Sequence, residues 1–235
     1  MLKVRWRRLT KAFAGWDLGR MKALVITGGE CPPPELLRRF ALESRLVIAA
    51  DSGLDAALTA GIRPDIVVGD FDSLKDMKGL DTIPPGKILA FSREKDDTDT
   101  EIAIQTAWNN GSDYIVLAGG GGGRLDHLLG IWALFAREPP PREWHTREES
   151  VYFLGKGESA VFGVSIGSIV SVFPSGGRAS SGMTSSGLKW PLEGLDWAEG
   201  HYGISNESAE NHVRVSAGSC SLLIILPLGC ERLPE

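Results

Sequence analysis

Short apolar runs alternate with helix-like segments between residues 21 and 138, and this alternation constrains the fold more than any other feature of the sequence. Five runs have the length of buried strands, at 23–27, 46–50, 65–68, 87–91 and 114–118. Helical patterns lie between them, at 34–41, 54–60, 98–108 and 125–136. Pro34 occupies a first helical turn, and Gly61 follows the second helix as a stop signal. The pattern predicts an α/β fold, a Rossmann-like and mostly parallel sheet with helices on its faces.

The pattern changes after residue 138. Residues 139–149 contain three prolines and many charges, which predicts a linker. Short β-rich segments separated by Gly/Ser-rich turns follow, at 151–154, 159–164, 169–173, 213–215 and 222–226. We therefore expect an α/β domain at 21–138, a linker at 139–149, and a smaller all-β domain at 150–235, a sandwich or partial barrel.

Charge is distributed unevenly along the chain. Residues 1–20 hold six of the 25 basic and one of the 30 acidic side chains, so the remainder carries a net charge of −10. Such an acidic body does not suit nucleic-acid binding, which depends on neutralising phosphates with Lys and Arg. Phosphate groups would need a metal ion between the like charges. The basic leader, 1–20, fits an extension from an upstream start codon or a transit peptide; we expect the extension and assign it no function.

Cysteine content and hydropathy bear on the compartment. Three cysteines without Cys-x-x-Cys spacing favour neither a disulfide framework nor a zinc site, and they are typical of a reducing compartment. The longest apolar run, near 222–228, has the length of a strand and is too short for a membrane span. We expect a cytoplasmic protein with no membrane partner.

Two carboxylates follow the third apolar run directly. In the motif Gly-Asp-Phe-Asp-Ser at 69–73, the period of an extended chain puts Asp70 and Asp72 on one side. Open α/β sheets bind ligands at the carboxyl ends of their strands, and paired carboxylates suit Mg²⁺ that substrate phosphates complete. A polar turn with a helix cap is the alternative for this motif taken alone.

A second acidic segment, Lys-Asp-Asp-Thr-Asp-Thr-Glu at 95–101, lies between a strand and a helix. Negative charge at a helix N-terminus accounts for one or two of its acids, but repulsion among all four favours a bound cation. Asp51, in the segment Asp-Ser-Gly that follows 46–50, adds another polar strand end, which a helix cap would explain equally well.

Five glycines at 119–123 join the fifth apolar run to a helix and precede Arg124. A flexible linker is the ordinary interpretation of such a run. At a junction of strand and helix, however, backbone amides can bind phosphate, and Arg124 adds a bidentate donor. The run lacks the third glycine of the dinucleotide fingerprint, and the sequence contains no P-loop motif. The strand-end groups together predict one shared crevice.

In their order and context these motifs resemble the thiamine pyrophosphokinase family. The resemblance rests on Ala-Asp-Ser-Gly at 50–53, Pro-Asp at 64–65 leading into 69–73, Lys-Asp-x-Thr-Asp at 95–99, Gly-Gly-Arg-Leu-Asp-His at 122–127, Gly-Leu-Lys-Trp-Pro-Leu at 187–192 and Ser-Asn at 205–206. It covers about residues 21–228. It implies Mg²⁺-dependent transfer of pyrophosphate from ATP to thiamine, with release of AMP, by a homodimer that binds thiamine between its subunits.

The resemblance and the side-chain chemistry together imply individual roles. The α/β domain would be catalytic, and the β domain would bind thiamine and dimerise. Asp70, Asp72 and Asp99 would hold Mg²⁺, and Arg124 would neutralise charge during phosphoryl transfer. Asp99 is our choice of proton acceptor, a role that the sequence leaves open among the carboxylates. Nucleotide binding would involve Asp51, Ser52, Gly53, Ser73, Asp96, Thr98, Gly122, Gly123, Arg124, Asp126 and His127.

For thiamine, the resemblance implies three residues of the second half. Trp190 could stack on the cationic aromatic ligand, and Ser205 and Asn206 could hydrogen-bond its aminopyrimidine edge. Burial of Trp190 in the core is the alternative. The sequence departs from the family at 120–121, where Gly-Gly replaces Ala-Thr, and near Ile131, where an Asn is common; each departure removes a polar group.

Two other functions stay open. One is transfer of a phosphoryl or pyrophosphoryl group to another alcohol, such as a pterin-like or nucleoside substrate. The other is a regulator that binds thiamine or a nucleotide without catalysis. The set of acids argues against a regulator, since a sensor has little need for so many metal-facing carboxylates.

Overall fold

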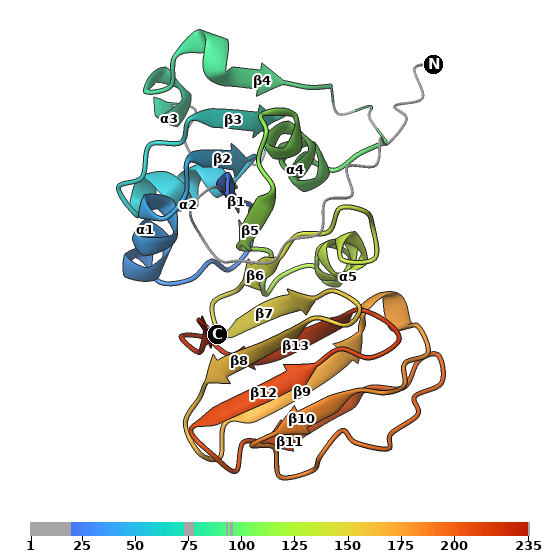
Figure 1. The fold of residues 1–235 in the computed structure, drawn as a ribbon. Helices are drawn as coiled ribbons and strands as arrows, with labels where there is room; N and C mark the ends of the chain where they lie inside the picture. The colour runs from blue at the N-terminus through green and yellow to red at the C-terminus, as the bar shows by residue number, and fades with distance from the viewer. Residues whose placement is uncertain (1–19, 73–77, 93, 95, 235) are drawn as a thin grey trace.

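The computed structural model describes residues 20–72, 78–92, 94 and 96–234. In the first half, strands and helices alternate as predicted (Figure 1). The strands are β1 (Lys22–Ile26), β2 (Leu46–Ala50), β3 (Ile66–Gly69), β4 (Ile88–Ala90) and β5 (Tyr114–Ala118). The helices are α1 (Pro34–Leu42), α2 (Gly53–Thr59), α3 (Lys78–Asp81), α4 (Asp99–Asn109) and α5 (Leu125–Leu134), with a 3-10 turn at Pro85–Lys87. Predicted ends differ from these by at most two residues, and α3 is additional.

The second half consists of strands and a 3-10 turn at Ser175–Gly177. The strands are β6 (Glu143–His145), β7 (Glu149–Leu154), β8 (Ser159–Gly163), β9 (Ile169–Pro174), β10 (Thr184–Ser186), β11 (Gly203–Glu207), β12 (His212–Ser216), β13 (Leu222–Pro227) and β14 (Glu231–Leu233). The sequence predicted β7, β8, β9, β12 and β13. None of the helices formed by the described residues combines the length and apolar character that a membrane span requires.

One mixed sheet runs through both halves in the order β11-β9-β13-β7-β6-β5-β1-β2-β3-β4. The strands from β6 to β4 pair in parallel, and the others pair antiparallel. A separate antiparallel sheet has the order β10-β12-β8-β14. Phe162 and Val213 of this sheet share a core with Val172 and Ile224 of the large one. The mixed α/β class is therefore confirmed, with two β layers packed face to face in the second half, while the Rossmann-like description stays a prediction.

The expected linker, 139–149, contains a strand. β6 pairs in parallel with β5 and antiparallel with β7, so that Ala118 and Ser150 both lie opposite His145. The strand was not predicted because it has only three residues, Glu-Trp-His, among three prolines and many charges. Its pairing partners, β5 and β7, both lie outside residues 139–148. β6 thus joins the two sheet portions instead of separating them.

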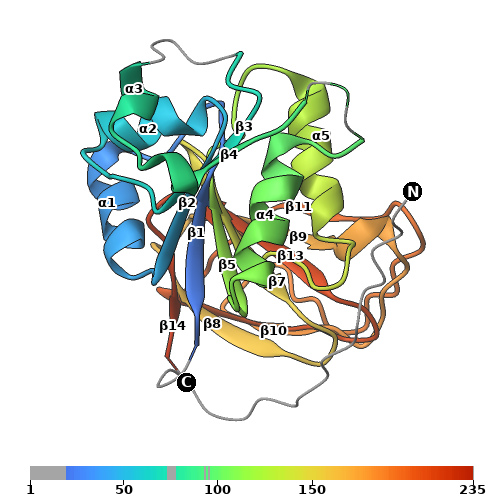
Figure 2. The same ribbon diagram turned by 90° about the horizontal axis from the view of Figure 1, so that it is seen from above.

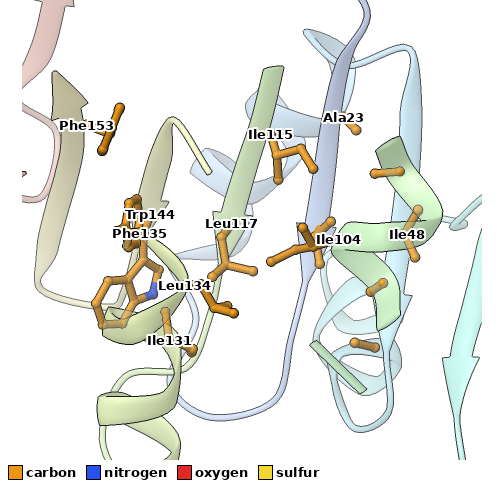
Figure 3. Packing of buried hydrophobic residues seen from close by; sticks show 14 of the residues in the cluster. Ala23, Ile48, Ile104, Ile115, Leu117, Ile131, Leu134, Phe135, Trp144 and Phe153 are labelled. Atoms are coloured by element: carbon orange, nitrogen blue, oxygen red, sulfur yellow. The ribbon is translucent and has the colours of Figure 1, made fainter. Parts of the chain in front are cut away.

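Helices cover both faces of the parallel part of the sheet (Figure 2). Phe40 of α1 and Ala57 of α2 belong to a core on one face. Ile104 of α4 and Ile131 of α5 belong to a core on the other face, and this core continues past β6 to Phe153 of β7 (Figure 3). The two predicted domains therefore share one sheet and one hydrophobic core.

Polar side chains connect β5, β6 and β7 at this junction. His145 is 2% exposed, and its ring nitrogens lie 2.9 Å from Ser150 Oγ and from Glu143 Oε2. The Tyr114 hydroxyl donates to Glu143 Oε1 at 2.5 Å, and the Phe40 ring stacks on the imidazole with a centroid distance of 4.4 Å. Burial alone would raise the pKa of Glu143, but the hydrogen bond and charge interaction with His145 outweigh burial and lower that pKa to about 2. The junction therefore retains a charged carboxylate.

Candidate active site

The carboxyl ends of the parallel strands meet at one edge of the sheet, where most of the predicted residues lie. Asp51 follows β2, Asp70 follows β3, and Gly119 follows β5. β1 lies between β2 and β5, and the helices that follow β1 and β5 cover opposite faces. Ligands of open α/β sheets bind at such a point, because the connections diverge there and leave a crevice.

Three carboxylates at this edge form an acidic cluster, defined here as Asp51, Asp70 and Asp72. One oxygen atom of each residue lies within 4.8 Å of the others. Asp51 and Asp70 are half-buried, and Asp72 is exposed. A set of carboxylate oxygens suits a hard divalent cation such as Mg²⁺, which would also offset the repulsion among three negative charges. The residues present therefore fit a magnesium ion.

Unusual backbone positions bring these carboxylates together. The Asp51 amide donates to Val68 O at 2.8 Å, which ties the end of β2 to β3. Gly69 passes so close that a Cβ atom there would lie 3.2 Å from Asp51 Cα. Phe71, between the two other acids, has a φ of 63° and packs in a small core with Leu54. Because a bulky residue rarely adopts this conformation, burial of the Phe71 ring is what holds the loop and its flanking acids in place.

The start of α2 lies against the end of β1. A Cβ atom on Gly53, the first residue of α2, would lie 2.1 Å from Ile26 O, so the position requires glycine. Ser52 Oγ occupies the space where Gly28 would carry its Cβ, 2.3 Å from that position. Both residues thus set the spacing of two strand-end loops, and their nucleotide-binding roles stay predictions. Ser73, predicted for the same role, lies outside the described residues.

The first part of the glycine run packs within the protein. The Gly119 amide donates to His145 O at 2.9 Å, and the Gly120 amide donates to Gly28 O at 2.7 Å. A Cβ atom on Gly120 would lie 2.0 Å from Ile131 Cδ1. The expectation that the amides of the whole run bind phosphate is therefore wrong for these two, because distant segments that the sequence pattern does not reveal already accept their protons.

The second part of the run is exposed. Gly122 and Gly123 have φ values of 61° and 64°. A Cβ atom on Gly123 would meet no atom within 4 Å, whereas one on Gly122 would lie 2.7 Å from Glu30 Cδ. Arg124 forms a two-point ion pair with Asp126, with Nε 3.1 Å from Oδ1 and Nη2 2.5 Å from Oδ2. The pair raises the pKa of Arg124 and lowers that of Asp126. The amide of exposed His127 also donates to Asp126. An incoming phosphate would compete with Asp126 for the guanidinium.

α4 begins with a capping box. Thr98 Oγ1 accepts a hydrogen bond from Glu101 N at 3.2 Å, and Glu101 Oε2 accepts one from Thr98 N at 2.7 Å. Glu101 also pairs with Arg137. Burial raises the pKa of Glu101, but its hydrogen bonds with Thr98 and its pairing with Arg137 together outweigh burial and lower that pKa overall. Capping therefore explains one of the four acids in this segment, within the one or two that were expected to have this role.

Asp99 is the first residue of α4 and does not belong to the close carboxylate group found among the described residues. Asp96, just before the helix, is exposed. Their predicted roles stay predictions. One contact at this edge was not predicted: Thr27 Oγ1 lies 2.6 Å from Thr100 Oγ1 and connects the end of β1 to α4. The signal was the hydroxyl that ends the first apolar run.

The residues expected to bind thiamine lie in the second half. Trp190 is 52% exposed, so the alternative of a core residue is not supported. Trp132 and Trp197, in contrast, pack against the hydrophobic cores. Ser205 of β11 is exposed and has a φ of 59°. Asn206 is 8% exposed, and its carboxamide bonds to the Trp190 backbone. The expected hydrogen bond between this carboxamide and a ligand therefore needs revision.

The acidic cluster and Trp190 lie far apart within one chain. The acidic cluster follows β2 and β3, whereas Trp190 lies beside β11, the opposite edge strand (Figure 1). Eight strand-to-strand steps separate β3 from β11. Each step is about 4.8 Å, so the separation along the sheet is on the order of 40 Å.

Comparison with known proteins identifies relatives of this chain. Residues 37–140 match the family model described as thiamin pyrophosphokinase, catalytic domain. Thiamine pyrophosphokinase of Bacillus subtilis (strain 168) is 33% identical over 108 residues, covering 45% of this chain and 50% of the relative. Thiamine pyrophosphokinase 1 of Oryza sativa subsp. japonica is 28% identical over 169 residues, covering 67% of this chain and 64% of the relative. The aligned segments thus span between half and two thirds of these curated relatives.

The fold comparison extends over most of the molecule. The crystal structure of thiamin pyrophosphokinase from Geobacillus thermodenitrificans superposes with a TM-score of 0.69 at 28% identity, covering 88% of this chain and 97% of the other. The match includes the second half, which the family model does not reach. In its motifs, in the family model over residues 37–140 and in this fold, the chain is similar to the thiamin pyrophosphokinases.

Proposed function

We propose that this protein transfers a pyrophosphoryl group from ATP to the hydroxyethyl oxygen of thiamine, with Mg²⁺, to give thiamine diphosphate and AMP. The observation that carries the proposal is the acidic cluster at the carboxyl edge of the sheet, in a chain similar to this family. An edge with this much negative charge binds a nucleotide triphosphate only through a cation, which accounts for three carboxylates at one point.

Asp51, Asp70 and Asp72 would hold the magnesium ion, with Asp99 as a further candidate ligand. When bound, the ion supplies positive charge that neutralises the triphosphate oxygens. The remaining contacts come from the chain itself. The Gly122 and Gly123 amides lie in the exposed part of the glycine run, and Arg124 would exchange its partner Asp126 for a phosphate.

The acceptor oxygen needs a base. Asp99, at the N-terminus of α4, would accept the hydroxyl proton as the thiamine oxygen attacks the β-phosphorus of ATP. The bond from the β-phosphorus to the oxygen bridging it to the α-phosphorus breaks, and AMP leaves with that oxygen. Positioning and electrostatic stabilisation carry most of the catalysis in such a transfer, which agrees with a site made of carboxylates, amides and one guanidinium.

Trp190 would supply a stacking face for the aminopyrimidine and a cation–π contact, and Ser205 an adjacent hydroxyl. In this proposal thiamine binds between two copies of the chain. The support is the separation of Trp190 from the acidic cluster along the sheet, because a single small ligand cannot span a gap on the order of 40 Å.

The test is an assay of AMP release with ATP and thiamine, with and without Mg²⁺. We expect AMP only when all three are present, and a fall in kcat on the order of 100-fold or more for Asp72→Asn. Asp113→Asn, an exposed Asp at the opposite end of the parallel strands, is the matched control and should retain activity. Absence of AMP with both substrates and Mg²⁺ would overturn the proposal. AMP with another alcohol only would indicate a different acceptor, and thiamine binding without turnover would indicate a regulator.

A further inference from the structure

The segment that carries Trp190, residues 187–192, is attached along the outer side of β11. Leu188 forms an antiparallel bridge with Ser208. The Lys189 amide donates to Glu207 O at 2.8 Å, and Lys189 Nζ lies 2.8 Å from Glu207 Oε2. These contacts place the backbone just before Trp190 but leave the tryptophan itself to be held by other groups.

The Asn206 side chain holds the Trp190 backbone. Asn206 Oδ1 accepts hydrogen bonds from Trp190 N at 3.2 Å and from Glu207 N at 2.8 Å. Asn206 Nδ2 donates to Trp190 O at 2.7 Å. One carboxamide thus binds both polar backbone groups of Trp190 and does so at a site that is 8% exposed. A buried amide in this arrangement is costly to remove, because the backbone groups would lose their partners.

A β-bulge turns Asn206 inward. The pairing of β11 with β9 shifts register between Gly203 and Asn206. Ser205, at the shift, has a φ of 59°, and its amide donates to Ser171 Oγ at 3.1 Å. Ile204 and Ser205 consequently remain exposed while Asn206 is buried. Bulges re-aim side chains in this way, and the strain at a non-glycine residue persists only where its surroundings fix it.

The indole of Trp190 is consequently exposed on a backbone that is fixed. Its side chain is half accessible to solvent, and Lys189 Nζ lies 4.7 Å from its ring centroid. An aromatic face that is already oriented loses little conformational entropy when a flat ligand stacks on it. The Lys189 ammonium over the ring is itself paired with Glu207, which offsets its positive charge.

We propose that Asn206 is a positioning residue that presents the Trp190 indole to an aromatic, cationic acceptor and does not itself contact that acceptor. This inference rests on the proposed function for the identity of the acceptor, thiamine. It differs from the expectation drawn from the sequence, in which the Asn206 amide binds the ligand directly.

A double-mutant cycle separates the two possibilities. We expect Asn206→Ala to raise the KM for thiamine about tenfold and to leave the KM for ATP within about twofold. In a Trp190→Ala background, the same substitution should change the KM for thiamine less than about twofold, because its effect passes through the indole. Equal effects in both backgrounds would show direct contact and overturn the proposal, as would an unchanged KM for thiamine. Asn211→Ala, an exposed Asn in the turn after β11, is the matched control.

A second measurement needs no turnover. Acrylamide quenching of the ligand-free protein, with the Trp190 signal obtained by difference from Trp190→Phe, should change in Asn206→Ala and stay unchanged in Asn211→Ala. Unchanged quenching in Asn206→Ala would overturn the positioning role even if thiamine is not the substrate. Failure of the wild type to release AMP would instead reject the proposed function alone. Asn206→Asp keeps the acceptor oxygens and loses the donor to Trp190 O, so a smaller shift in the same direction is expected if the alanine variant does not fold.

Discussion

The buried carboxylate of Glu143 gives a stability prediction whose size follows from the structure. Its side chain is 14% exposed, with one oxygen 2.9 Å from His145 Nε2 and the other accepting from the Tyr114 hydroxyl. These contacts lie where the parallel strands meet the sandwich, so loss of the charge should affect the whole molecule. We consider the substitution Glu143→Gln, which keeps the size of the side chain and removes its charge.

The magnitude comes from the pKa of Glu143, which falls from 4.5 to about 2 on folding. Each unit corresponds to about 1.4 kcal/mol, so the charged form contributes about 3 kcal/mol to the free energy of unfolding at pH 7. Because the pKa is lower in the folded state, this contribution is complete above pH 4.5 and is lost as the pH falls towards 2. We therefore expect Glu143→Gln to cost about 3 kcal/mol at pH 7 and progressively less below pH 4.5.

The assay is urea unfolding of both proteins at a series of pH values from 7 to 3.5, followed by circular dichroism and tryptophan fluorescence. The difference in free energy of unfolding between wild type and variant should shrink at the acid end of the series. Glu148→Gln is the control, since Glu148 is 80% exposed and pairs with Arg147 at 3.6 Å, and it should change stability by about 0.5 kcal/mol or less. A difference that stays constant from pH 7 to 3.5, or one below about 1 kcal/mol at pH 7, would refute the reasoning.

Two further predictions concern the loops at the candidate active site. Phe71→Ala should lower the free energy of unfolding by about 3 kcal/mol, because it empties a buried position. It should also raise the Mg²⁺ concentration for half-maximal AMP release. Phe71→Leu should change both the stability and the Mg²⁺ requirement less. An unchanged Mg²⁺ requirement would contradict the role of the ring in holding the loop. Gly120→Ala should cost about 2 kcal/mol, since φ is 73° and the added methyl would overlap Ile131 Cδ1. Ile131→Val deletes that atom, so urea unfolding should show that the double variant loses about 1 kcal/mol less than the sum of the single ones; additive losses would contradict the overlap.

Local patterns were sufficient for all strands of the first half, for its helices other than α3, and for part of its site. Asp70 and Asp72 could be predicted because the period of an extended chain puts alternate residues on one side. Asp51 lies close to Asp70 and Asp72 because β2 and β3 are neighbours in the sheet. The sequence predicts this only indirectly, through the rule that the strand ends of a parallel sheet share a crevice. The acids of the cluster could therefore be found. The capping box of Thr98 and Glu101 is also local in the sequence, whereas the pair of Glu101 with Arg137 depends on tertiary structure.

Non-local pairing explains the features that were missed. β6 is three residues long and carries no period of its own, so only the strands on either side define it. The Gly119 amide is satisfied by His145, a residue 26 positions later in the chain, and no glycine pattern predicts that bond. The sequence does not predict that Asn206 is buried, because its burial depends on the β-bulge at Ser205.

The continuity of the sheet bears directly on how many chains form a site. If the two halves were separate domains on a linker, they could close on one ligand as a hinge closes. β6 removes that freedom, because it pairs with β5 on one side and β7 on the other. Trp144 of β6 and Phe153 of β7 also pack in the same core as Ile104 of α4, so hinge bending would break a packed interior as well as strand pairs. The acidic cluster and Trp190 can therefore act on one thiamine molecule only if they come from two copies of the chain, which is why the proposed function requires a dimer.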